Sequence, residues 1–74
     1  MKQFEKFVGK QVYLTTPRAK YIGTLEHEDR FFIYLADCVV LVRSKRKSPY
    51  AVVRKGQILE MRVIGGEANG YTKT

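Results

Sequence analysis

Two basic clusters, residues 43–47 and 54–55, flank the short apolar run of residues 51–53. Lys and Arg side chains bind phosphate oxygens, so both clusters are candidate contacts for a polyanion. The whole chain carries 14 Lys and Arg against 7 Asp and Glu, a formal charge of +7. This balance favours RNA, DNA or an anionic membrane surface as a partner, and composition does not choose among them. The alternative interpretation is that the charges keep a small domain soluble.

Residue types that perform catalysis or hold metal ions are scarce in this chain. There is one cysteine, Cys38, and one histidine, His27, so neither a zinc site nor an intrachain disulfide can be assembled. No nucleophile with a candidate base, no paired-carboxylate arrangement and no phosphate-binding glycine loop is present in the sequence. We therefore expect neither an enzyme nor a cofactor. We interpret His27 as a strand surface residue and Cys38 as a small apolar filler.

The length of 74 residues allows one small domain with a thin core. Chains of this size are usually stabilised by disulfides, a structural metal or self-association, and only self-association remains here. The single thiol fits a reducing compartment, so we expect a soluble, cytoplasmic protein. No apolar stretch is long enough to span a bilayer, and MKQFEKFVGK carries charges where a signal peptide needs apolar residues.

Hydrophobic spacing predicts a short helix followed by strands. Phe4, Phe7 and Val8 recur at the spacing of one helical face, which predicts a helix over residues 2–8 that Gly9 terminates. β-Branched and aromatic residues separated by turn formers then predict five strands, at residues 11–15, 20–28, 30–43, 49–54 and 58–64. The polar, glycine-rich residues 65–74 are expected to be a disordered tail.

A helix and five short strands predict a mainly β protein, in which a strongly bent antiparallel sheet closes into an SH3-like barrel. Gly23 lies inside the second predicted strand and marks a sharp bend or a close approach of two backbones. The run FFIYLADCVVLV, residues 31–42, is apolar on both faces. Its excess apolar face must contact the N-terminal helix, a neighbouring copy, or both.

The fourth and fifth predicted strands have the composition of sheet edges that are unpaired within one chain. The segment of residues 51–53 is short and apolar. In residues 58–64 apolar side chains alternate with Glu60 and Arg62. Pairing the fourth strand of one copy with the fifth strand of the next covers both edges and closes a ring if the rotation permits. We therefore predict a homo-oligomeric ring.

Two stretches resemble the Sm-like family, which comprises the Sm and LSm proteins and the bacterial RNA chaperone Hfq. The stretch GTLEHEDRFFIYL, residues 23–35, is similar to the first signature of that family, with a spacing closest to the Hfq branch. The stretch VVRKGQI, residues 52–58, is similar to the second signature in position and length. The resemblance covers residues 4–64 and implies an Sm-like domain over residues 1–64.

The resemblance implies a ring whose pore binds single-stranded, uridine-rich RNA without catalysis or a cofactor. By position, Asp29 and Phe31 lie in the first pore loop, with Arg54 and Lys55 in the second. Phe31 would stack on a base, and Lys55 would hold a phosphate or carbonyl oxygen. Arg30 would add charge or stack its guanidinium on a base.

The chain departs from the family where the base is selected. Sm proteins have an asparagine where this chain has Phe32 and Ile33, and Gly56 stands where Hfq has a histidine. These departures favour RNA binding that is less selective among bases, or a different ligand. They also leave open a ring or adaptor protein that binds protein partners and not RNA; the sequence does not name those partners.

Each candidate residue also has a structural interpretation. Phe31 could be a core aromatic residue, and Asp29 could cap a turn through the backbone. Arg54 and Lys55 could be solvated charges in a tight turn. Residues 43–49 are interpreted as a charged hairpin tip with optional nonspecific phosphate contacts.

Overall fold

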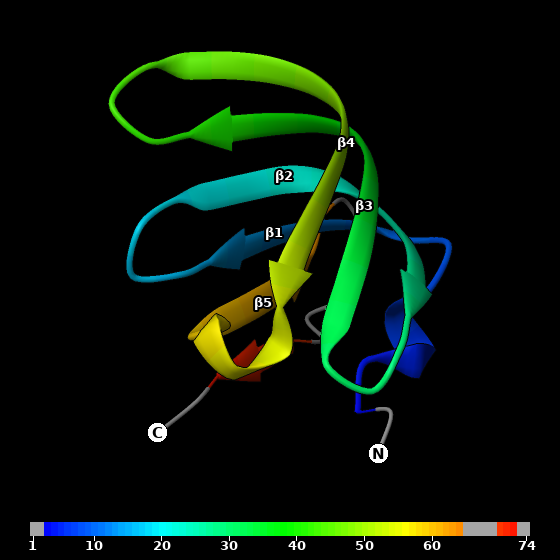
Figure 1. Cartoon of the computed structure of the whole chain (residues 1–74). Helices are drawn as coiled ribbons and strands as arrows, with labels where there is room; N and C mark the ends of the chain where they lie inside the picture. Colours follow the sequence, from blue (N-terminus) through cyan, green and yellow to red (C-terminus); the bar gives the residue numbers. More distant parts are fainter. Residues whose placement is uncertain (1–2, 65–69, 73–74) are drawn as a thin grey trace.

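The computed structural model describes residues 3–64 and 70–72, and Figure 1 shows an antiparallel sheet preceded by a short helical turn. The elements are η1 (Glu5–Phe7), β1 (Gln11–Thr15), β2 (Lys20–Glu28), β3 (Phe32–Leu41), β4 (Lys45–Arg54), η2 (Lys55–Gln57), β5 (Glu60–Val63) and β6 (Gly70–Thr72), where η denotes a 3-10 helical turn. Five of these strands correspond to the five predicted ones, and β1 and β2 have the predicted bounds.

The strands form one open sheet in the order β4-β3-β2-β1-β5-β6, with antiparallel neighbours throughout. The protein is therefore mainly β, as predicted. The prediction of a closed barrel is wrong, since no strand pair within the described residues joins β4 to β5 or β6. The short turn η2 leads β5 to the side of β1, where Met61 pairs with Leu14, and not back to β4.

The N-terminal helix is shorter than predicted. The sequence predicts a helix over residues 2–8, whereas the structure has a 3-10 turn over Glu5–Phe7. Phe4 and Phe7 are buried as their spacing predicts, but Val8 is exposed because its backbone is already extended. Gly9, at φ +87°, donates its N–H to the Leu25 carbonyl at 2.7 Å and so ends the turn against β2. No helix in residues 3–64 or 70–72 is long and apolar enough to cross a membrane.

The core is built from alternate side chains of the strands together with η1. Successive side chains of a strand point to opposite faces, so Ile33 and Leu35 of β3 are buried while Phe32 lies on the outer face. Each fully buried Leu, Ile or Phe side chain contributes about 1.5–3 kcal/mol of burial free energy. The buried core residues are Phe4, Phe7, Val12, Leu14, Leu25, Ile33, Leu35, Cys38, Val53, Ile58 and Met61.

β2 and β3 are irregular where their register shifts. One shift lies between Ile22 and Thr24, at Gly23. A Cβ atom at Gly23 would lie 3.0 Å from the Ala36 carbonyl oxygen, which confirms the predicted close approach of two backbones. In β3, Asp37 has a positive φ of 51°, and Figure 1 shows β3 and β4 changing direction together midway along their length.

The β3–β4 hairpin has a shorter loop than predicted. Residues 43–49 were expected to form the tip, but β4 begins at Lys45, which pairs with Leu41, so residues 42–44 make the connection. β4 is an edge strand of the sheet. An edge strand tolerates Lys side chains and Pro49, because one side of its backbone needs no partner strand.

The far edge of the sheet also differs from prediction. Residues 70–72 form β6, which pairs with β5 from Glu60↔Thr72 to Arg62↔Gly70, although residues 65–74 were expected to be disordered. The rest of that segment lies outside the described residues. β5 therefore lies between β1 and β6, and its prediction as a sheet edge is wrong. Backbone pairing requires no apolar side chains, which explains why a polar segment can form this strand.

Candidate nucleic-acid interface

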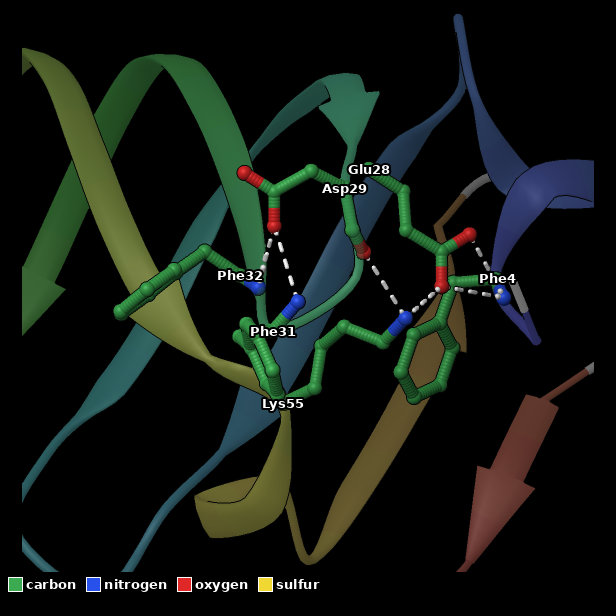
Figure 2. Close-up of polar contacts among 6 residues, drawn as sticks. All are labelled: Phe4, Glu28, Asp29, Phe31, Phe32 and Lys55. Carbon is green, nitrogen blue, oxygen red and sulfur yellow. Dashed lines mark hydrogen bonds and ion pairs between the residues drawn. The ribbon is translucent and has the colours of Figure 1, made fainter. Parts of the chain in front are cut away.

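The loop between β2 and β3 and the turn η2 meet at one end of the sheet. The Lys55 backbone N–H donates to the Phe31 carbonyl at 2.8 Å. Lys55 Nζ donates to the Asp29 carbonyl at 3.0 Å, as Figure 2 shows. The two segments that the family resemblance assigns to the pore are thus in direct contact. Asp29, Arg30, Phe31, Arg54 and Lys55 are all brought to this end of the sheet.

The Lys55 side chain is buried in an ion pair. Its Nζ lies 2.7 Å from Glu28 Oε2, and the Lys55 and Glu28 side chains are 8% and 1% exposed. The Glu28 carboxylate also accepts the Phe4 N–H at 3.0 and 3.2 Å (Figure 2). Lys55 was expected to be a solvent-exposed cation, and that expectation is wrong. The pair instead connects the N-terminal turn, the end of β2 and η2.

The Asp29 carboxylate caps the loop that presents Phe31. Its Oδ1 accepts the backbone N–H groups of Phe31 at 2.9 Å and Phe32 at 2.8 Å, and its Oδ2 accepts the Tyr34 hydroxyl at 2.6 Å. The Tyr34 hydrogen bond and then the backbone hydrogen bonds lower the pKa of Asp29. The same hydrogen bond raises the pKa of Tyr34. Asp29 thus shapes the loop, in agreement with its structural interpretation.

Phe31 and Arg30 project from the loop into solvent. Phe31 is 57% exposed, so it is not a core residue. The Arg30 guanidinium carbon lies 5.4 Å from the centroid of the Phe31 ring, within the range of a cation–π contact. An exposed aromatic ring beside a guanidinium is suited to stacking on a base and to pairing with its phosphate.

Arg54 is an exposed cation close to this loop. It ends β4, pairs with Phe32 across the β3–β4 ladder and directly precedes Lys55. Of the two adjacent cations predicted in this turn, Arg54 is therefore exposed and Lys55 is buried. The other basic cluster, residues 43–47, is exposed and lies at the opposite end of β4 (Figure 1).

Sequence reasoning missed an aromatic row on the outer face of the sheet. The row consists of His27 from β2, Tyr34 from β3 and Tyr50 from β4. The His27 and Tyr34 ring centroids are 5.4 Å apart, and those of Tyr34 and Tyr50 are 6.2 Å apart. The signal was present in the apolar outer positions of residues 31–42, which were expected to contact the helix or another copy.

The part of the chain that the structure describes contains neither a cluster of metal-binding side chains nor an exposed thiol. No group of three or more His, Cys, Asp or Glu side chains there could hold a metal ion. Cys38 is buried, and burial raises the pKa of its thiol. His27 is exposed on β2, which agrees with its interpretation as a strand surface residue.

Comparisons with models of protein families and with curated proteins give no match for this chain. The fold and the site define a small antiparallel β protein with an exposed loop that carries an arginine and a phenylalanine side by side. The resemblance to the Sm-like family rests on residues 23–35 and 52–58 of the sequence alone.

Proposed function

We propose that this protein is an Sm-like homo-oligomer that binds single-stranded RNA through the β2–β3 loop and the end of β4. The observation that carries the proposal is the Phe31 ring, which is largely exposed and has the Arg30 guanidinium 5.4 Å from its centroid. Core packing does not explain an aromatic ring in this position, whereas base stacking does. The net charge of +7 and the contact between the two loop segments support the same function.

The residues of the interface have separate roles in this proposal. Phe31 stacks on a base, and Arg30 and Arg54 contact phosphates. Glu28, Lys55 and Asp29 position the loop and do not touch RNA. Stacking accepts every base because each has a π-face, and Phe32 and Ile33, which follow Phe31, carry no side-chain amide to read a base edge. RNA binding in this proposal is therefore weakly selective among bases. It requires no cofactor, and the single thiol fits a reducing, cytoplasmic environment.

Assembly depends on the two edges of the sheet. A ring that pairs β4 of one copy with β5 of the next requires β6 to leave β5. β6 contributes three residues to that edge, and β5 itself spans four residues, so β4 of another copy would replace β6 with a ladder of similar length. The exchange therefore depends on the concentration of copies. It brings copies of Arg30 and Arg54 near one axis, where like charges repel unless an anion binds between them.

RNA binding is tested by fluorescence anisotropy with labelled oligouridine, oligoadenine and mixed-sequence RNAs over a series of salt concentrations. We expect similar affinities for the three RNAs and a steep loss of affinity with salt. Phe31→Ala should weaken binding by about 1–3 kcal/mol, as expected when one base no longer stacks on an aromatic ring. Arg54→Ala should weaken binding more than Arg18→Ala, which removes the same charge from the turn between β1 and β2. Unchanged affinity in both Phe31→Ala and Arg54→Ala would refute the site.

Assembly is tested by size-exclusion chromatography with light scattering. We expect a truncated chain that ends at Ile64 to form the oligomer at a lower concentration than the full chain, because the β5 edge is then available. A truncated chain that remains monomeric at every concentration at which it is soluble would contradict the ring.

A second candidate function is an adaptor protein that uses the same edges but binds protein. The burial of Lys55 against Glu28 favours it, because the cation expected to hold RNA is engaged within the protein. The ratio of absorbance at the nucleic-acid and protein wavelengths in freshly purified material separates the two functions. RNA carried through purification supports the first, and its absence at low salt supports the second.

A further inference from the structure

The outer face of β3 and β4 joins the two basic clusters of the chain. β4 begins with Lys45, Arg46 and Lys47 and ends with Arg54, and all four side chains are exposed. Between these ends the outer face carries Tyr34, Tyr50 and Val52, where Tyr34 pairs with Val52 and Ala36 pairs with Tyr50. Side chains alternate between the two faces along a strand, so Arg46 shares the face of Tyr50, Val52 and Arg54, whereas Lys45 and Lys47 point to the other side of β4. The outer face therefore has one cation from each basic cluster, with aromatic residues between them.

Of the two tyrosine rings on this surface, Tyr50 is exposed to solvent and Tyr34 is half-buried and held in position. Tyr50 is 51% exposed, although it has the size and apolar character of a core residue. The Tyr34 ring is fixed by its hydroxyl, which donates to Asp29 at 2.6 Å, and by the His27 ring at a centroid distance of 5.4 Å. A row of rings on an exposed sheet face is the arrangement on which single-stranded bases stack in several RNA-binding folds.

The charge of the surface indicates which class of molecule can bind to it. β3 and β4 together carry four cations, at positions 45, 46, 47 and 54, and one acid, Asp37, and the Asp29 carboxylate adjoins the Tyr34 hydroxyl. A second copy placed face to face would bring these cations together, which is unfavourable. A polyanion is complementary to them, and one that also carries flat apolar rings matches the tyrosines. Single-stranded nucleic acid has both properties.

From this arrangement we infer that a single-stranded nucleic acid lies along β4 on the outer face of the sheet. Its bases stack on Tyr50 and Tyr34, and its phosphates contact Arg46 at one end and Arg54 at the other. This inference extends the proposed RNA-binding function, because the nucleic acid that reaches Arg54 continues onto the β2–β3 loop. Side chains stand perpendicular to the sheet, so pairing of the β4 edge with another copy leaves this face accessible.

The test compares Tyr50 variants in RNA binding by fluorescence anisotropy. We expect Tyr50→Ala to bind a mixed-sequence RNA about tenfold more weakly, the effect of losing one stacked base. Tyr50→Phe keeps the ring and should bind within about twofold of wild type. Leu59→Ala, which truncates an exposed apolar side chain next to β5, serves as the control and should leave affinity unchanged.

Two further measurements distinguish stacking and phosphate binding from a change in folding. The chain has five tyrosines and no tryptophan, so RNA that stacks on Tyr50 should quench tyrosine fluorescence, and Tyr50→Phe should reduce that quenching. Arg46→Gln should lower the salt slope of binding by about 0.7, because one phosphate is no longer neutralised. Circular dichroism confirms that each variant is folded.

The outcomes separate this surface from the loop site. Weaker binding in Tyr50→Ala with unchanged binding in Phe31→Ala would support the outer face and reject the loop. The reverse result would overturn the inference and leave the proposed function intact. Equal affinity of wild type and Tyr50→Ala, with no tyrosine quenching, overturns the inference in every case.

Discussion

Lys55 Nζ lies 2.7 Å from Glu28 Oε2, and both side chains are almost completely excluded from solvent. The ion pair connects η2 to the end of β2, and Glu28 extends the connection to the Phe4 backbone. Two buried charges are stable together because each compensates the desolvation of the other, but either one alone is not. The basic turn at residues 54–55 is therefore fixed to the core by one of its two cations.

The first prediction concerns the energy of this pair. Lys55→Met should lower the free energy of unfolding by about 3 kcal/mol, because it leaves the Glu28 carboxylate buried without its cation. Adding Glu28→Gln should cost less than the sum of the single changes, with a coupling of about 1–3 kcal/mol. Urea denaturation of wild type, both single variants and the double variant measures the coupling. Additive changes in the free energy of unfolding would show that the Lys55 and Glu28 side chains do not stabilise each other.

The second prediction concerns pH and the Asp29 cap. The pKa of Asp29 is lowered in the folded protein, so its ionised form stabilises the fold above its ordinary value of 3.8, and this contribution is lost as the pH falls through the lowered value. Asp29→Ala should therefore be less stable than wild type at neutral pH. The difference should shrink as the pH falls below 3.8, which urea denaturation at a series of pH values measures.

Tyr34→Phe provides the control for the Asp29 prediction. It removes the hydrogen bond that contributes most to the lowered pKa, so the pKa of Asp29 should rise toward its ordinary value. An NMR titration of the Asp29 carboxylate measures this change. The same pKa in Tyr34→Phe and wild type would contradict the assigned cause.

The third prediction concerns the close approach at Gly23. A Cβ atom there would lie 3.0 Å from the Ala36 carbonyl oxygen and 3.3 Å from Cys38 Sγ. Gly23→Ala should therefore lower the free energy of unfolding by about 1–3 kcal/mol. Gly56→Ala is the matched control, because a Cβ atom at Gly56 meets nothing within 4 Å. Thermal denaturation that gives the same destabilisation for both variants would contradict the packing argument.

The fourth prediction concerns the thiol of Cys38. The side chain is 2% exposed, and burial raises the pKa of the thiol, so little reactive thiolate forms at neutral pH. The native protein should react with a thiol reagent at least about tenfold more slowly than the protein in denaturant. Equal rates under both conditions would show that the strand around Cys38 opens readily.

The strands were predictable because their signals are local. Alternating apolar residues between turn formers define β1 and β2 to the residue. The open sheet and β6 were not predictable, because strand pairing depends on which backbone edges meet in space. β4 extends into the basic residues 45–47 for the same reason. Backbone pairing with β3 makes this segment a strand, although its polar composition favours a loop.

The candidate site was predictable in part. The sequence and the family resemblance brought Asp29, Arg30, Phe31 and the turn at residues 54–55 together, and the structure places the two segments in contact. The burial of Lys55 was missed because its partner, Glu28, lies far away in sequence within a polar segment. The aromatic row was missed because Tyr50 and Tyr34 become neighbours only through the register of β3 with β4.

The claim that RNA is bound at the β2–β3 loop is tested most directly by photocrosslinking. A short RNA containing a photoreactive uridine is bound to the full-length protein at low salt and irradiated, and crosslinked residues are located by mass spectrometry. We predict crosslinks at Phe31 or its neighbours Arg30 and Phe32, which decrease when unlabelled RNA competes. Crosslinks that are absent from this loop, or that unlabelled RNA does not reduce, would contradict the account.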